Sequence, residues 1–116
     1  MAYWGDGSDD CDYAFDSMGS YIAFMRDRMF AAAEGAIAEK YPEQTILVTL
    51  EALRLLWDRF PKVVACGFRR DDFRKSQELF ARWLEAASPD LSGRRKSTLS
   101  AESQRVFAAC EEMFNG

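Results

Sequence analysis

Acidic side chains gather on one face of the helix that the first third of this chain predicts. Wound at about 3.6 residues per turn, this stretch projects five of them within a narrow arc that contains no lysine or arginine: Asp9, Asp12, Asp16, Asp27 and Glu34. Three interpretations fit such a row. It attracts a basic protein surface, it coordinates Mg²⁺ or Mn²⁺ through carboxylate oxygens, or it is simply hydrated.

Two aromatic residues, Tyr13 and Phe24, flank this acidic row on the same side of the helix. Aromatic side chains are enriched where proteins bind one another, although these two would equally well pack beneath a loop. We therefore predict a partner-binding surface, with solvation and a metal site kept as alternatives. Its predicted members are Asp9, Asp12, Tyr13, Asp16, Phe24, Asp27 and Glu34.

Other metal and nucleophile chemistry finds little support in the sequence. An EF-hand loop counted from Asp6 would place Cys11 where glycine is required and Ser17 where the bidentate glutamate is required. The chain has no histidine and no CxxC pair, so neither a zinc site nor a histidine-assisted nucleophile is expected. We predict that the three cysteines, Cys11, Cys66 and Cys110, are reduced core residues.

Nucleotide and nucleic-acid binding are also not expected. The chain contains neither GxGxxG nor GxxxxGK[ST]. The basic run at residues 94–96 precedes Ser97 and Thr98, which would suit a phosphate contact or a kinase site, but three bases in a loop are more typical of a solvated surface. With an isoelectric point near 4.8, the protein offers too small a basic patch for DNA. We predict no catalytic residue, no bound metal and no cofactor.

The stretch that must organise the fold is residues 45–60, TILVTLEALRLLWDRF. As a helix it is apolar along one main stripe, while Val48 and Leu55 lie on roughly the opposite side. A helix that is apolar on two sides needs neighbours on both, so we expect this helix at the centre of a bundle. Its charged residues make it unsuitable for spanning a membrane. The main stripe consists of Ile46, Leu50, Leu53, Trp57 and Phe60.

Apolar residues recur at helical spacing in the rest of the chain as well, so we expect the remaining elements to be helices. Proline at positions 42, 61 and 89 separates them. We predict an all-α fold, a single compact bundle of four to five helices forming one domain over residues 1–116. Its parts are an irregular lead-in over residues 1–8, a long or once-bent helix from there toward Lys40, the central helix, a short helix or turn ending at Gly67, an amphipathic helix over residues 73–87, a polar loop over residues 88–99 and a last helix capped at Ser100.

Composition and charge bound the class of protein. Hydrophobic residues make up 48% of the 116 positions and aromatic residues 14%, which excludes a disordered chain. The net charge of −4 is unevenly spread, because residues 1–58 carry eleven acids against four bases whereas residues 59–116 carry eight acids against eleven bases. This uneven distribution of charge either steers a charged partner toward the protein or lets the two halves of the chain pair with each other. The N-terminus lacks a basic start and an apolar run, so we expect a cytoplasmic protein.

Two short stretches of the chain resemble known protein families. Trp4-Gly5, Asp9-Asp10, Ala14 and Asp16 resemble the opening of a family of small bacterial proteins that carry a domain of unknown function, although this chain lacks the aromatic residue that the family usually places before the acidic pair. That family has no agreed activity to carry over. The junction at residues 40–43, KYPE, leads into a leucine-rich helix in a manner similar to small helical immunity proteins of bacterial toxin systems.

From these observations we predict a cytoplasmic protein-binding module of bacterial or phage origin, not an enzyme. The sharpest form of the prediction is an immunity or antitoxin protein that occludes a basic surface of its toxin. A phage anti-defence inhibitor is one alternative, and an enzyme that uses the acidic row to hold a metal ion is another. The predicted partner is another protein, not a nucleic acid and not a membrane.

Overall fold

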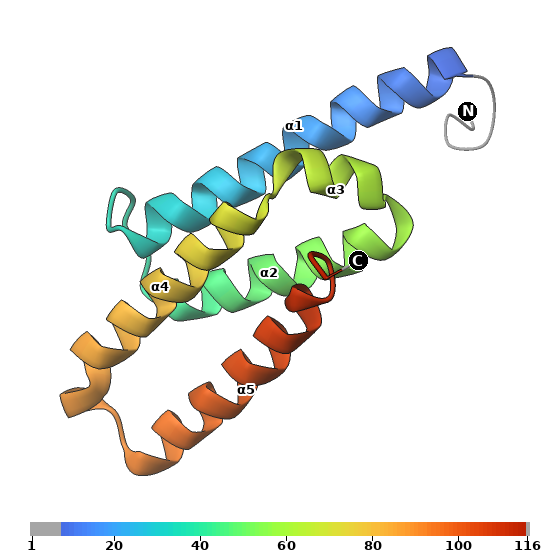
Figure 1. The fold of residues 1–116 in the computed structure, drawn as a ribbon. Helices are drawn as coiled ribbons and strands as arrows, with labels where there is room; N and C mark the ends of the chain where they lie inside the picture. The colour runs from blue at the N-terminus through green and yellow to red at the C-terminus, as the bar shows by residue number, and fades with distance from the viewer. Residues whose placement is uncertain (1–7, 116) are drawn as a thin grey trace.

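The computed structural model describes the backbone of residues 8–115 and the side chains of residues 16–115. This part of the chain folds into helices with no strand among them, so the predicted all-α bundle is confirmed (Figure 1). The elements are α1 (Ser8–Ala33), α2 (Pro42–Arg59), α3 (Pro61–Gly67), α4 (Arg70–Ala87), the 3₁₀ turn η1 (Ser88–Asp90) and α5 (Gly93–Glu111).

Helix α2 is the central element, as predicted. It lies against α1, α3, α4 and α5. Pro42 stands in its first turn, where the missing backbone N–H costs nothing and the fixed φ favours a helix start. Ile46, Leu50 and Leu53 have no solvent-accessible surface, and Trp57 and Phe60 pack against the same core from its edge.

The expectation that a neighbouring helix covers the side of α2 that carries Val48 and Leu55 is wrong. Val48 and Leu55 remain 62% and 67% exposed. Helix α5 joins α2 along another of its sides, where the Arg54 Nε donates to the Ala109 carbonyl at 3.0 Å. No element in the described part of the chain is left to cover Val48 and Leu55.

Helix α1 ends earlier than the predicted limit near Lys40. Its last residue is Ala33, and Gly35 follows with a φ of +80°. This left-handed conformation is accessible to glycine without strain and terminates the helix. The apolar stripe of the helix is confirmed where side chains are described, since Ile22 and Met29 are fully buried. The other glycine of the helix, Gly19, does not interrupt it.

The predicted loop over residues 88–99 is also wrong in most of its length. Helix α5 begins at Gly93, with the Ser92 hydroxyl capping it by accepting a hydrogen bond from the Arg95 N–H at 3.1 Å. The first turns of this helix are almost entirely polar because they face solvent. Leu99 is the first fully buried residue of the helix, which is why apolar periodicity placed the start near Ser100.

Aromatic rings join the two C-terminal helices and the last residues of the chain. Phe73 of α4 stacks on Phe114 with ring centroids 5.5 Å apart, and Phe80 meets Phe107 of α5 edge-on at 5.7 Å. Such pairs add to the free energy of burial. They fix the end of α5 beside the start of α4 and so shape a pocket described below.

Candidate functional site

The structure describes four of the seven predicted partner-binding residues. Asp16, Phe24 and Asp27 are exposed on α1, as the helical projection predicts, and Glu34 is exposed in the turn that follows the helix. Phe24 is 66% exposed, so it does not pack beneath a loop. The side chains of the other three, Asp9, Asp12 and Tyr13, lie outside the described residues.

Two of the carboxylates have basic partners that the sequence projection missed. Asp27 Oδ1 pairs with Arg26 Nε at 2.9 Å, and Glu34 Oε1 pairs with Lys75 Nζ of α4 at 3.0 Å. Lys75 also lies 4.4 Å above the ring of Phe30. Arg26 was foreseeable as the chain neighbour of Asp27, whereas nothing local in the sequence places α4 beside α1. Part of the acidic row is thus neutralised within the fold.

Asp16 differs from these two carboxylates. It pairs with no basic side chain in the described part of the protein, and it lines a cleft of about 370 Å³ between α1 and α3. Small residues form much of this cleft, among them Gly19, Ala23 and Gly67. Its far wall is fixed because Arg26 Nη1 donates to the Gly67 carbonyl at 2.8 Å. Among the three described aspartate and glutamate side chains of the predicted row, Asp16 is therefore the one that keeps an uncompensated charge within the described residues.

An exposed aromatic residue that sequence reasoning missed lies next to Phe24. Tyr21 is 67% exposed and precedes Phe24 by three residues, so the two side chains are neighbours on the helix surface. We call these two residues the aromatic face of α1. The available signal was that neither residue fits the apolar stripe through Ile22 and Met29. The N-terminal part of α1 extends beyond α3 (Figure 1).

The cysteines divide into different environments. Cys66 is exposed on the rim of the α1–α3 cleft, which makes its predicted core position wrong. It lies near the end of a short helix whose buried side is already supplied by Val63 and Val64. Cys110 is fully buried as predicted, and its Sγ donates to the Leu50 carbonyl at 3.4 Å. Burial raises the pKa of the Cys110 thiol to about 12. The side chain of Cys11 lies outside the described residues.

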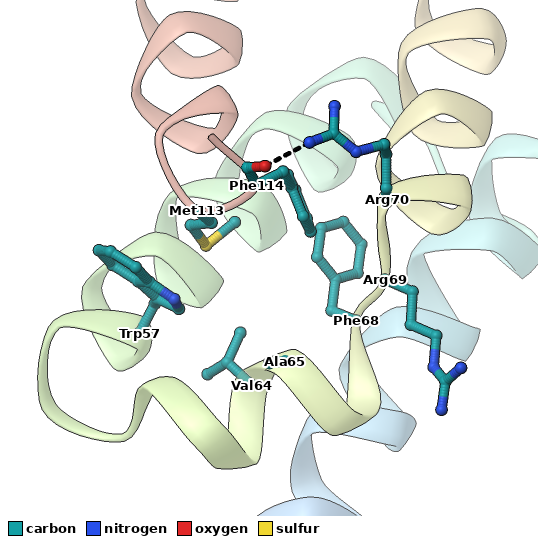
Figure 2. A pocket seen from close by; sticks show the side chains of 8 residues that line it. All are labelled: Trp57, Val64, Ala65, Phe68, Arg69, Arg70, Met113 and Phe114. Atoms are coloured by element: carbon teal, nitrogen blue, oxygen red, sulfur yellow. Dashed lines mark hydrogen bonds between the residues drawn. The ribbon is translucent and has the colours of Figure 1, made fainter. Parts of the chain in front are cut away.

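A pocket of about 270 Å³ lies where α2, α3 and the start of α4 meet the last residues of the chain (Figure 2). Trp57, Val64, Phe68, Met113 and Phe114 give it apolar walls. Its volume is below the roughly 300–1,000 Å³ of typical small-molecule sites. It suits a single apolar group better than a metabolite.

The two arginines at the pocket do not supply it with a free cation. Arg70 donates to the Phe114 carbonyl, pairs with Glu111 at 3.6 Å and lies 5.5 Å from the centre of the Phe114 ring. The Arg69 side chain points away from the cavity (Figure 2). The pocket therefore has no obvious means of holding a carboxylate or phosphate.

No group of three or more Cys, Asp or Glu residues in the described part of the chain is arranged to hold a metal ion. The segment with Asp9 and Asp12 is not covered by that observation. None of the described helices combines the length and the hydropathy that crossing a membrane requires.

Comparison of the chain with protein-family models, with curated proteins and with solved structures gave no match. The two resemblances noted in the sequence therefore remain predictions. A functional hypothesis for this chain has to come from its own surface.

Proposed function

We propose that this protein is a protein-binding module and that the exposed face of α1 is its binding surface. The observation that carries the proposal is the pair Tyr21 and Phe24, each about two-thirds exposed and adjacent to each other on the helix. Tyrosine is enriched among the residues that dominate binding energy, and tyrosine and phenylalanine are both enriched at protein–protein interfaces. Asp16, which has no basic partner among the described side chains, lies on the same helix, together with the sequence-predicted members Asp9, Asp12 and Tyr13.

The two kinds of side chain would contribute differently. Burying the rings of Tyr21 and Phe24 against a partner removes apolar surface from water and slows dissociation. The carboxylates supply long-range attraction, which speeds encounter with a basic protein and is damped by salt. Because Asp27 and Glu34 already pair with Arg26 and Lys75, we assign the attraction chiefly to the aspartates from Asp9 to Asp16.

More specifically, we propose that the protein is an immunity or antitoxin protein whose helix α1 occludes a basic surface of its toxin. Small size, an all-α bundle and the junction at residues 40–43 support this form. A phage anti-defence inhibitor would use the same surface chemistry. Co-expression with the product of the adjacent gene separates the two, because an immunity protein restores growth to cells that make the toxin.

Capture from a lysate of the source organism tests the binding surface. Tyr21→Ser/Phe24→Ser should lose the captured protein at every salt concentration, because it removes contact area. Asp12→Lys/Asp16→Lys should slow association, with the largest effect at low salt. The matched control is Arg74→Glu/Arg82→Glu on the exposed face of α4, which should retain capture.

Circular dichroism of each variant establishes that the fold is intact, since exposed positions usually tolerate substitution. Loss of capture in the α4 control together with full capture by both α1 variants would place the binding surface elsewhere and refute the assignment to α1.

A further inference from the structure

Helix α2 carries a row of exposed apolar residues on the side that no described element covers. Tyr41 immediately precedes the helix and is 53% exposed, Val48 is 62% exposed and Leu55 is 67% exposed. These three are spaced by seven residues, so they follow one line along the helix with a drift of about 20° per heptad. Ala52 lies between Val48 and Leu55 and is half-buried. We call these four residues the outer stripe of α2.

Two hollows accompany the outer stripe in the groove between α2 and α5. The larger, about 180 Å³, lies beside Val48 and has Leu47 and Gln44 in its lining. The smaller, about 70 Å³, lies beside Leu55 and is lined by Arg54 and Ala109. Val48 and Leu55, which are two helical turns apart, therefore each lie next to a hollow.

An ion pair separates the hollows. Arg105 of α5 contacts both carboxylate oxygens of Glu51, at 3.0 and 3.5 Å, and these two residues line both hollows together with Val106. Glu51 and Ala52 are the residues midway between Val48 and Leu55. The centre of the surface is thus a matched pair of charges flanked on either side by one apolar projection and one hollow.

We propose that this surface binds a second copy of the same chain, with the two α2 helices antiparallel about a two-fold axis near Glu51 and Ala52. In this arrangement Leu55 of each copy comes to the hollow beside Val48 of the other, and Val48 comes to the hollow beside Leu55. The larger side chain meets the larger hollow and the smaller side chain meets the smaller one. This reciprocal match is what an isologous interface requires, and it resembles knobs-into-holes packing.

Charge is compatible with the same arrangement. Antiparallel helices place their dipoles favourably. The two Glu51 carboxylates would approach each other at the axis, but each is already paired with its own Arg105, so the centre of the interface is a neutral group of four charges. The proposed interface leaves the aromatic face of α1 out, and it is therefore independent of the function proposed above.

Sedimentation velocity of the full chain tests the proposal over a range from about 1 µM to 1 mM. The wild type should move with rising concentration from the monomer mass of 13.2 kDa to twice that value. Leu55→Glu and Val48→Glu should each stay monomeric, because they bring charge into an apolar contact. Ala81→Glu, at an exposed residue of α4, should reach the dimer mass over the same concentration range as the wild type.

Cross-linking tests the register and does not depend on the glutamate variants. In a background with Cys11→Ser and Cys66→Ser, Ala52→Cys should form a disulfide-linked dimer on mild oxidation, because position 52 lies at the axis. Ser20→Cys on α1 should not. A wild type that stays at the monomer mass at 1 mM, or a dimer that persists in Leu55→Glu, would overturn the proposal; the first result would assign the stripe to a different protein.

Discussion

Gly67 lies directly against Ile22 where α3 crosses α1. A Cβ atom placed on this glycine would stand 2.7 Å from Cγ2 of Ile22, closer than real Cβ contacts allow. Ile22 is fully buried, so it has little room to move aside. The carbonyl of Gly67 meanwhile accepts a hydrogen bond from Arg26. Glycine is thus required at the end of α3 by close approach and not by backbone conformation.

We expect Gly67→Ala to lower the free energy of unfolding by about 1–3 kcal/mol, the usual cost of forcing extra volume into a packed core. Urea denaturation followed by circular dichroism measures the change. Gly19→Ala is the matched control, because nothing lies within 4 Å of a Cβ added there and alanine is favoured over glycine inside a helix by about 1 kcal/mol. Equal stability changes in the two variants would contradict the proposed contact.

Two leucines of α2 allow a second comparison. Leu53 is fully buried and Leu55 is 67% exposed, so Leu53→Ala should cost about 2–5 kcal/mol, whereas Leu55→Ala should cost no more than about 0.5 kcal/mol in the monomer. Chemical denaturation at low micromolar concentration measures both. A loss below about 1 kcal/mol for Leu53→Ala would mean that α2 contributes little to the core.

The sequence was sufficient to predict the helices and the central position of α2, because periodic apolar residues and the three prolines are local signals. It was insufficient where contacts between residues far apart in the sequence determine which side chains are paired and which are exposed. The pairing of Lys75 with Glu34 depends on α4 lying beside α1, and the exposure of Val48 and Leu55 depends on which side of α2 receives α5. The polar start of α5 was missed because solvent-facing turns carry no apolar period. In the candidate site, Phe24 was found from its place on the helix, but Tyr21 was overlooked.

The difference between the cysteines predicts their reactivity. A thiol with a pKa of about 12 contains almost no thiolate at neutral pH. In a Cys11→Ser background, Ellman's reagent should therefore modify one thiol of the native protein promptly, that of the exposed Cys66. Cys110 should react only after unfolding in denaturant. Prompt modification of Cys110 in the native state, identified by peptide mass, would show that the α2–α5 contact opens readily.

Metal binding provides a test of the alternative enzyme hypothesis. A ligand that binds only the folded state raises the melting temperature according to its concentration and affinity. We expect millimolar Mg²⁺ or Mn²⁺ to leave the melting temperature unchanged in differential scanning fluorimetry. A rise that disappears in Asp12→Asn/Asp16→Asn would instead favour a metal site on the acidic row and the enzyme interpretation.

Glu43 predicts a pH dependence of stability. It is only 2% exposed near the start of α2, and its Oε1 has no hydrogen-bond partner among the described residues. Burial raises the pKa of this carboxyl above its ordinary value of 4.5, and the nearby Glu39 adds to the rise, although backbone N–H groups of α2 and the charge of Arg95 oppose it. The folded state therefore holds this proton more tightly than the unfolded state does.

At pH values between the pKa of Glu43 in the unfolded state and its higher pKa in the folded state, the folded protein binds more protons than the unfolded protein. The contribution of Glu43 to the free energy of unfolding therefore falls as pH rises through this range and stays low above it. Glu43→Gln, which stays neutral, should therefore be more stable than the wild type at pH 7, by an amount on the order of 1 kcal/mol. Its advantage should shrink as pH falls through this range and disappear below the ordinary pKa of 4.5. Denaturation of both proteins from pH 3.5 to 8 measures this. Glu78→Gln, at an exposed position of α4, should show no such trend, and a pH-independent difference for Glu43→Gln would mean that the carboxyl of Glu43 is hydrated in the folded protein.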